Sequence, residues 1–416
     1  MPAVIKETED MRIDLPGGDA GRVAVMVDKY PCLSESFIRR ELTNLASLGF
    51  KLVVLTCSPA RRSDRALLPE SPFNVFFPEA HSGRDHVRLA AESLRELPRA
   101  LTLFPKGPRS TAAAGRAAWT AAAIRPALES WKPDWLHAHF LGMPAAAACL
   151  LSQRLNVPLS ISAHARDIFV PQVDLAKLCS RARFVSTCSE HARTSLIEQL
   201  PSQLAKRVVH FSHDVECGPT VKNQEQVNGF PLRLLSVCRL VPKKGVDVIL
   251  KALALLRSES ECRYRYRIVG GGPELSRLKA LASDLNLEDV EFVGPVSPDV
   301  VQRELAHADV FVLGARRMPD GDRDGIPNAM LEAMAAGIPV IVSDAGGVSE
   351  VIRHRSTGWL LPPNNPEAFA DALREVALDH RVRRRVAASA RAEVRRRFSQ
   401  NGRLLALKLS SEMANS

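Results

Sequence analysis

The sequence predicts an α/β protein made of two doubly wound domains, each with a parallel sheet covered by helices on both faces. Short and nearly all-apolar runs recur along the chain, as in buried parallel strands, and segments long enough for helices separate them. Residues 212–231 are polar, rich in turn-forming residues and without periodicity, which predicts a linker between two such series. With 416 residues the chain is long enough to bury two cores.

The domain plan follows from this pattern. We expect a flexible leader at residues 1–20, a first domain at 21–211, the linker at 212–231, a second domain at 232–398 and a C-terminal helix at 399–416.

Composition narrows the class of protein. The formal net charge of +10 suits a partner that is nucleic acid, an anionic membrane surface or an anionic small ligand. Nucleic acid is the least favoured of these partners, because aromatic and basic residues are not interleaved along the chain. No signal peptide and no apolar run of about 18 residues is found, so we expect a cytoplasmic protein that can touch the inner face of a membrane. The eight cysteines form no C-x-x-C pair, which favours free thiols in a reducing compartment.

The first domain opens with a strand at 22–27, a loop and a helix to about residue 48, for which we expect Phe37, Leu42 and Leu45 on the apolar face. A second strand follows at 51–56. Ser34 and Glu35 lie in that loop, at the carboxyl end of a strand, where doubly wound sheets bind ligands. The alternative for Ser34 is a plain helix N-cap.

Residues 80–130 are Arg- and Ala-rich helical stretches that we expect to be broken by Pro98, Pro105 and Pro108. Their basic residues alternate with apolar ones. This predicts a basic amphipathic surface for a lipid-linked or anionic acceptor, or else a solvated outer helix.

Histidines gather at the next strand ends. His137 and His139 lie on one side of the strand at 135–140, and His164 follows the strand at 158–163. Strands at 183–188 and 208–211 complete the domain. A metal trio is conceivable, but the spacing matches no zinc template, and ordinary core histidines are the alternative.

The second domain begins with a strand at 232–237, after which Arg239 and Lys244 can both reach a diphosphate. Solvated loop cations are the alternative. A strand at 265–269 leads into Gly270-Gly271-Gly272-Pro273, where glycines permit close backbone approach to a ligand. The run does not fit the dinucleotide fingerprint G-x-G-x-x-G.

A third stretch, DRDGIPNAMLEAMAAGIPVIVSDAGG from Asp322, combines two acids with a helix start. Pro327 suits the first turn of a helix, whose free N–H groups near Asn328 form an anion site. Asp324 and Glu332 are separated by seven residues. The acids could instead be solvated, or Asp320-Gly321-Asp322-Arg323-Asp324 could be read as a D-x-D metal site.

On these motifs the chain resembles glycosyltransferase family 4, whose E-x7-E signature corresponds to Asp324 and Glu332, with Asp in place of the first Glu. The loop at Ser34 is similar to the P-x-x-S-E-T-F stretch of exopolysaccharide and colanic-acid-type members, with Ser36 in place of Thr. The family often has Gly-Val-Asp where this chain has Asp214-Val215-Glu216. The resemblance runs from about Arg22 and implies the GT-B fold, in which two Rossmann-like domains face a central cleft, with the last helix crossing back to the first domain.

The resemblance also implies roles for the residues. Donor-binding residues would be Arg239 and Lys244 at the diphosphate, Glu332 at the ribose, and Gly271, Gly272, Val293 and Asn328 around them. Catalytic residues would be His139, His164 and Asp324, with Ser34 and Glu35 on the acceptor side. No metal and no cofactor is implied.

The implied function is a retaining glycosyltransferase. It would move a sugar from a nucleoside-diphosphate sugar to a lipid-linked or oligosaccharide acceptor in exopolysaccharide or cell-surface glycan synthesis. A GT-B-type nucleotide-sugar epimerase, a non-catalytic scaffold in polysaccharide assembly and a nucleic-acid-binding protein are the alternatives. The sequence does not name the nucleotide, the sugar or the linkage.

Overall fold

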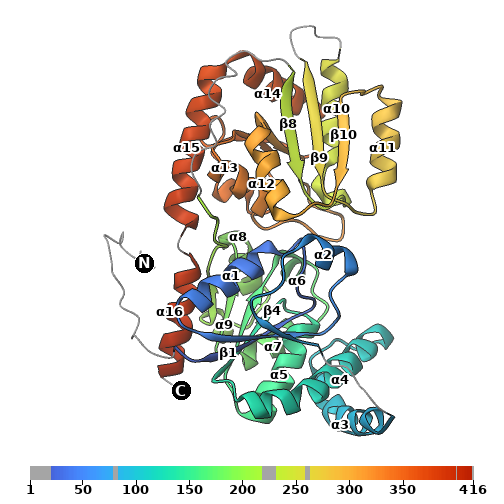
Figure 1. The fold of residues 1–416 in the computed structure, drawn as a ribbon, viewed down its shortest axis with the longest axis vertical. Coiled ribbons are helices and arrows are strands. Elements are labelled where there is room, and N and C mark those ends of the chain that lie inside the picture. The colour runs from blue at the N-terminus through green and yellow to red at the C-terminus, as the bar shows by residue number, and fades with distance from the viewer. Residues whose placement is uncertain (1–19, 78–82, 218–230, 258–262, 400, 415–416) are drawn as a thin grey trace.

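The computed structural model describes residues 20–77, 83–217, 231–257, 263–399 and 401–414. The expected leader and residues 218–230 of the expected linker lie outside the described residues. Two α/β domains stand one above the other in Figure 1, with the second domain at the top. The prediction of two doubly wound domains with parallel sheets is confirmed.

The first domain contains, among the described residues, a seven-stranded parallel sheet in the order β3-β2-β1-β4-β5-β6-β7. Its strands are β1 (Arg22–Val27), β2 (Lys51–Thr56), β3 (Asn74–Phe76), β4 (Trp135–His139), β5 (Leu159–Ala163), β6 (Phe184–Thr187) and β7 (Val208–His210). The strand order reverses direction between β1 and β4. Loops that leave the two strands there diverge, and this opens a crevice for ligands.

Helices cover both faces of this sheet (Figure 1). They are α1 (Ser36–Ser47), α2 (Arg62–Leu67), α3 (Gly83–Thr102), α4 (Pro108–Trp131), α5 (Met143–Leu155), α6 (Ala165–Phe169), α7 (Leu175–Arg181), α8 (Glu190–Glu198) and α9 (Ser202–Ala205). On one face, the Ala-rich helices α4 and α5 pack closely, with Ala117, Ala121 and Ala146 buried. Small side chains allow this close approach, which explains the high Ala content of the region.

The second domain contains, within the described residues, a six-stranded parallel sheet in the order β10-β9-β8-β11-β12-β13. Its strands are β8 (Leu232–Val237), β9 (Tyr264–Val269), β10 (Val290–Gly294), β11 (Val310–Leu313), β12 (Val340–Ser343) and β13 (Trp359–Leu361). Its helices are α10 (Val246–Leu256), α11 (Leu275–Asp284), α12 (Pro298–His307), α13 (Asn328–Ala335), α14 (Pro366–Leu378) and α15 (His380–Phe398).

The last helix, α16 (Asn401–Ala414), lies on the first domain (Figure 1). Its Leu405 and Leu409 are buried in one cluster with Leu42 of α1 and Trp135 of β4. The second domain is therefore tied to the first at both of its ends, by the segment after β7 and by α16.

Three local expectations are wrong. Pro98 does not break its helix but lies inside α3, near the C-terminal end. The carbonyl that Pro98 leaves without a helical partner belongs to Leu94, which is exposed to water. Ser34 is not the N-cap of α1, which begins at Ser36 with Glu35 in the N-cap position.

The third concerns Phe37, which was expected on the apolar face of α1. That face is formed by Ile38, Leu42 and Leu45, while Phe37 stacks on His213 with a centroid separation of 4.2 Å and an interplanar angle of 9°. The short strand β3 and the helix α2 were not foreseen. Among the described residues no helix combines the length and the apolar character needed to span a bilayer.

Candidate active site between the two domains

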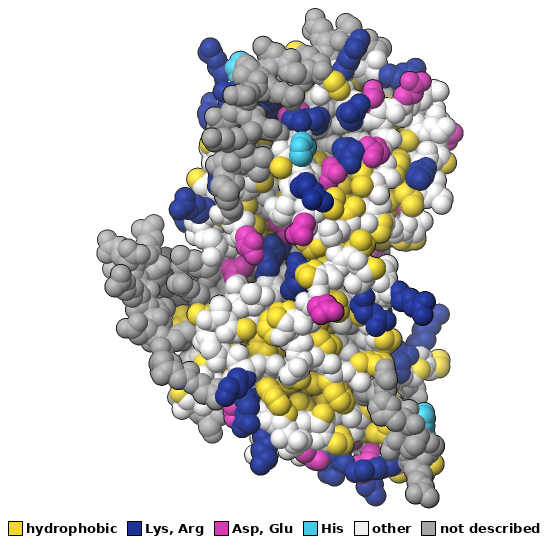
Figure 2. Space-filling model, in the orientation of Figure 1, with side chains coloured by type: hydrophobic (Ala, Val, Ile, Leu, Met, Phe, Trp, Pro, Cys, Tyr) yellow, Lys and Arg dark blue, Asp and Glu magenta, His cyan; other side chains and the backbone are white. Residues whose placement is uncertain are grey.

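The carboxyl ends of both sheets face the junction of the domains, where basic and acidic side chains gather at a narrow waist (Figure 2). Charged contacts join the domains there. Arg40 of α1 meets Glu332 of α13, and the carboxylate of Glu350 accepts hydrogen bonds from the backbone N–H groups of Glu190 and His191 at the start of α8.

A tight turn after β8 positions Lys243 and Lys244. A short 3-10 turn (Pro242–Lys244) ends at Gly245, whose φ of 60° is left-handed. A Cβ atom at Gly245 would lie 1.7 Å from the carbonyl oxygen of Gly314, so the position requires glycine. The turn places Lys244 Nζ 2.6 Å from Asp324 Oδ2.

Two lysines neutralise the acids of the loop before α13. Lys243 Nζ lies 2.9 Å from Asp322 Oδ1 and 3.5 Å from Asp324 Oδ1. Burial by itself would raise the pKa of Asp324, but Lys244 and Lys243 outweigh burial and hold that pKa below its usual value. Asp324 is therefore ionised at neutral pH.

Arg239 stands apart from this cluster. Its side chain is exposed and forms no ion pair with any described residue. An exposed guanidinium at the end of β8 can turn toward a diphosphate without first breaking a protein ion pair.

The glycine run after β9 is required by packing. A Cβ atom at Gly272 would lie 2.3 Å from the carbonyl oxygen of Leu240, and one at Gly271 would meet Pro295 at 3.4 Å. The run therefore lies against the loop that carries Arg239. Val293, at the end of β10, is partly buried beside it. Their proposed role in donor binding stays a prediction.

Glu332 is engaged by the opposite domain. Its Oε1 lies 2.7 Å from Arg40 NH2, and the side chains are 14% and 16% exposed. Asn328, the first residue of α13, accepts a hydrogen bond at Oδ1 from His213 Nδ1 at 2.9 Å. A ribose that binds Glu332 would have to compete with Arg40 or share the carboxylate with it.

This arrangement predicts that Arg40→Gln tightens nucleoside-diphosphate binding about tenfold, because one charge-assisted hydrogen bond no longer competes with the ribose. Titration calorimetry measures the change. Arg39→Gln, on the neighbouring position of α1, is the matched control and should leave the affinity unaltered. Weaker binding by the Arg40 variant would show that Arg40 helps to hold the nucleotide.

A ladder of polar side chains crosses β4, β5 and β6 beneath α1. Trp135 Nε1–H donates to Ser160 Oγ at 2.9 Å, and Ser160 in turn lies 2.7 Å from His137 Nδ1. Since the Ser160 hydroxyl donates to Nδ1, we assign the proton of neutral His137 to Nε2, which lies 3.1 Å from Ser162 Oγ. Burial lowers the pKa of His137, in keeping with this neutral form.

Glu41 of α1 is the carboxylate that faces this ladder. Its Oε1 lies 3.1 Å from His139 Nε2 and 3.5 Å from His137 Nε2. Burial would raise the pKa of Glu41, but His139 and His137 outweigh it and hold that pKa well below its usual range. Glu41 thus lies within ion-pair distance of both imidazoles, although neither contact has the geometry of a hydrogen bond.

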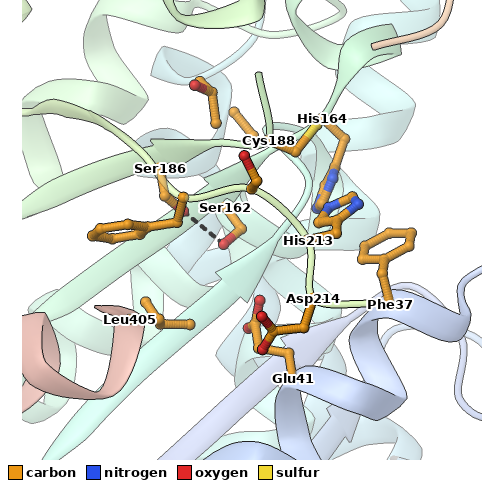
Figure 3. Close-up of a pocket in the computed structure, with 13 residues that line it drawn as sticks. Phe37, Glu41, Ser162, His164, Ser186, Cys188, His213, Asp214 and Leu405 are labelled. Carbon is orange, nitrogen blue, oxygen red and sulfur yellow. Dashed lines mark hydrogen bonds between the residues drawn. The ribbon is translucent and has the colours of Figure 1, made fainter. Parts of the chain in front are cut away.

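His139 is fully buried, and its Nδ1 lies 3.3 Å from His164 Nε2. His164 lines a pocket under the segment after β7, together with His213, Phe37 and Cys188 (Figure 3). Burial, reinforced by the neighbouring His139 and His213, keeps the pKa of His164 well below its usual value. Of the two histidines predicted to be catalytic, His164 reaches the pocket, and His139 stands behind it.

The predicted acceptor-side residues lie at the same end of the sheet. Ser34 is exposed. Glu35 has a buried Oε2 without a hydrogen-bond partner among the described residues. Burial raises the pKa of Glu35 to about 7, and the nearby charges of His139 and Arg239 limit the rise. Glu35 can therefore change its charge near neutral pH.

We expect Glu35→Gln to stabilise the fold by an amount that depends on pH. A carboxyl with a raised pKa in the folded state favours folding below its unfolded pKa, and this advantage is lost as the pH rises toward 7. The gain in the Gln variant should grow between about pH 4.5 and pH 7 and then stay constant, at no more than about 3 kcal/mol. Urea unfolding at a series of pH values measures it.

Glu288→Gln, at an exposed position of the second domain, is the control and should show no such trend. A stability difference that is independent of pH would contradict the buried, titrating state of Glu35.

Among the residues that the structure describes, two groups of side chains could hold a metal ion. Glu41, His137 and His139 form one group and His164, Cys188 and His213 the other, each with its ligand atoms within 4.8 Å of one another. Glu41 is already balanced by its two histidines. In the D-x-D alternative, Asp322 is paired with Lys243 and with Arg166, whose NH1 lies 2.9 Å from Asp322 Oδ2. Lysine and arginine side chains of the protein therefore already balance the charge of Asp322.

Sequence reasoning missed several residues of this site. Arg40 and Glu41 were read only as part of a helix, and His213 as part of a linker. Lys243, next to Lys244, was not proposed as a site residue. A polar residue within an apolar helix pattern, such as Glu41, is the one sequence signal that could have drawn attention to this group.

Comparisons with known proteins agree with this geometry. Residues 34–210 match the model of Glycosyltransferase Family 4, and residues 219–403 match the model of Glycosyl transferases group 1. The HepE protein of Anabaena, solved in complex with UDP-glucose, superposes with a TM-score of 0.70 at 18% identity, over 94% of this chain and 100% of that chain. The sucrose-phosphate synthase of Thermosynechococcus elongatus superposes with a TM-score of 0.74 at 18% identity, over 95% and 100% of the two chains. Two doubly wound domains with opposed strand ends define the GT-B class of fold.

Curated relatives point to the same family. The amylovoran biosynthesis glycosyltransferase AmsK of Erwinia amylovora is 39% identical over 41% of this chain and 42% of its own length. A putative colanic acid biosynthesis glycosyltransferase, WcaL of Salmonella typhimurium, is 40% identical over 41% of this chain and 43% of its own. The matched segments thus span less than half of each relative. Residues 34–210 thus form a Glycosyltransferase Family 4 domain and residues 219–403 a Glycosyl transferases group 1 domain, as the resemblance of the motifs to glycosyltransferase family 4 predicts.

Proposed function

We propose that this protein is a retaining glycosyltransferase that moves a sugar from a nucleoside-diphosphate sugar to a glycan or lipid-linked acceptor in exopolysaccharide or cell-surface glycan synthesis. The observation that carries the proposal is the opposition of two sets of side chains. Glu332 of the second domain meets Arg40 of α1, and Asp322, in the loop where Lys244 holds Asp324, meets Arg166 two residues after His164.

The donor would lie along the second domain. Arg239 and Lys244 would contact the diphosphate, and the free N–H groups at the start of α13 would add partial positive charge. Glu332 would accept hydrogen bonds from the ribose hydroxyls, with Val293, Gly271 and Gly272 beside the nucleoside. Positive charge that is already in place stabilises the leaving diphosphate without reorganisation, at a few kcal/mol for each well-placed donor.

The acceptor would enter from the first domain. His164 lines the pocket, and Ser34 and Glu35 lie on the neighbouring loop. A neutral His164 can accept or donate a hydrogen bond to an acceptor hydroxyl. Asp324 would lie near the donor sugar, and its shorter side chain, compared with Glu, leaves room for a bridging water. A lipid-linked acceptor would bring the enzyme to a membrane surface.

Donor binding tests this function most directly. Thermal unfolding is followed with UDP, GDP, ADP and CMP and with sugar donors that include UDP-glucose and GDP-mannose, because binding to the folded state raises the melting temperature. We expect one nucleoside diphosphate to stabilise the protein and its sugar ester to be consumed only with an acceptor. Consumption without an acceptor would favour the epimerase alternative, and no stabilisation by any nucleotide would contradict the proposal.

Metal removal is expected to leave turnover intact. Arg239, Lys244 and the N-terminus of α13 would supply the charge that a divalent ion would otherwise bring to the diphosphate. Turnover is compared before and after exhaustive EDTA treatment, with and without added manganese or magnesium. Loss on stripping with rescue by metal would show that carboxylates or histidines of this site are metal ligands.

A further inference from the structure

Helix α3 presents an apolar row on its outer side. Val87, Leu94 and Leu101 are 72%, 65% and 41% exposed, and they make up three of the seven large hydrophobic side chains that are exposed among the described residues. Because seven residues make nearly two helical turns, the three lie on one side of the helix. Ala91 and Pro98, also exposed, fill the positions between them. The row is therefore continuous along the helix.

The charges around this row have one sign. Between residues 86 and 109 the exposed Arg and Lys side chains are Arg88, Arg95, Arg99, Lys106 and Arg109. Both glutamates of α3 turn toward the protein instead. Glu96 is 8% exposed and lies 3.4 Å from Arg99, whose side chain stays 58% exposed. Glu92 is 18% exposed and is paired with Arg125 of α4 and with Arg95, each at 3.1 Å, while the Arg95 side chain stays 71% exposed. The outer side of α3 thus combines exposed apolar side chains with exposed cations and no exposed carboxylate in this stretch.

The position of the helix leaves this side open. The inner side of α3 packs on α4, where Ala100, Leu103 and Phe104 are buried. Figure 1 shows α3 and α4 at the end of the first domain that is remote from the second domain. In Figure 2, Lys and Arg side chains gather at this end of the molecule. A flat partner could approach here without contacting the donor-binding domain.

We propose that the outer side of α3 is a membrane-docking surface for bilayers that contain anionic lipids. The apolar row would enter the boundary between headgroups and acyl chains, and the flanking arginines would bind lipid phosphates. Such an apolar row with a basic border supplies the two signals that stable peripheral binding requires. The inference goes beyond the glycosyl transfer proposed above and does not depend on the donor.

Charge favours a lipid surface over a second copy of this chain. A symmetric dimer through α3 would place the same patch of both copies together and would bring the arginine rows against each other. Pro98 within the row also makes it a poor coiled-coil seam, because the missing N–H disturbs the helix there. Docking through α3 would hold the first domain, which we propose binds the acceptor, at the membrane.

Vesicle co-sedimentation of the full chain tests the proposal. The probes are vesicles of phosphatidylcholine alone and of phosphatidylcholine with about 30% phosphatidylglycerol, at about 0.15 M salt. We expect the wild type to bind the anionic vesicles and to bind phosphatidylcholine at least tenfold more weakly. Leu94→Gln/Leu101→Gln and Arg88→Gln/Arg95→Gln/Arg99→Gln should each bind the anionic vesicles at least tenfold more weakly than the wild type.

Matched control variants distinguish an effect of the α3 surface from a general effect of removing cations or exposed leucines. Arg381→Gln/Arg384→Gln/Arg385→Gln removes as many exposed cations from α15, and Leu255→Gln/Leu378→Gln removes two exposed leucines from the second domain. Both should bind as the wild type does, and all variants should melt like the wild type and keep the donor-induced stabilisation. Equal binding by the α3 variants, or no binding by the wild type, would overturn the proposal. A wild-type dimer that Leu94→Gln/Leu101→Gln dissociates would assign the surface to a second copy instead.

Discussion

Lys244→Ala is expected to lower kcat/KM for the sugar donor about ten- to a hundredfold, the range for loss of one hydrogen bond to a charged group. Lys244 is 14% exposed, whereas Lys243 is 7% exposed and engaged with Asp322, so Lys244 is the lysine with better access to a diphosphate. Steady-state kinetics with varied donor gives the value. Lys251→Ala, at an exposed position of α10, is the control and should behave as the wild type.

A double variant distinguishes diphosphate binding from charge balance. If Lys244 only neutralises Asp324, Lys244→Ala/Asp324→Asn should regain the activity of Asp324→Asn alone. If Lys244 contacts the diphosphate, the double variant should have an activity no higher than that of Lys244→Ala alone. Melting temperatures of both variants show whether the fold is intact. Wild-type kinetics in folded Lys244→Ala would remove Lys244 from the donor site.

His164→Ala is expected to lower kcat about a hundredfold or more, the range for loss of a group that exchanges protons with the substrate, and to leave the donor KM unchanged. His164 is the histidine of the buried pair that reaches the pocket, so its loss affects the acceptor and not the nucleotide. The pKa of His164 lies well below its usual value, so the pH profile of the wild-type kcat should show no inflection from His164 above about pH 6. Kinetics with saturating donor and varied pH provides the measurement.

His139→Gln serves as the comparison, because the amide can still contact Glu41 and His164 and should reduce kcat less than His164→Ala does. His307→Ala, at an exposed position of α12, is the control for loss of a histidine. If His164→Ala keeps the wild-type kcat while His139→Gln loses it, then His139 and not His164 contacts the reacting groups.

The strand pattern could be predicted from the sequence because buried parallel strands are short apolar runs, and apolar burial is a local property of each run. β1 (Arg22–Val27), β2 (Lys51–Thr56) and β8 (Leu232–Val237) have the expected bounds. β3 was missed because its Asn74 and Val75 are exposed at the edge of the sheet. Edge strands lack the two-sided burial that makes a central strand visible in sequence.

The motifs that we propose bind the sugar donor could also be predicted, because each lies within a short segment of the chain. Lys244 and Gly245 follow one strand, and Asp324 to Glu332 spans one loop and the helix after it, so the chemistry of each could be read within a few residues. What the sequence could not give is the partner that each group meets across the domain junction. Arg40 reaches Glu332 and His213 reaches Asn328 only because α1 and the segment after β7 lie beside the strand ends of the other domain.

The sequence by itself determined two parallel-sheet domains, their order and the residue types at the ends of their strands, because hydrophobic periodicity and turn chemistry act over a few residues. The tertiary structure alone decided that His139 is buried behind His164, that Glu41 faces the histidine ladder and that Arg40 occupies the carboxylate of Glu332. These contacts join residues that are remote in the chain. Burial and charge pairing at such distances depend on how the domains pack, and no local pattern records them.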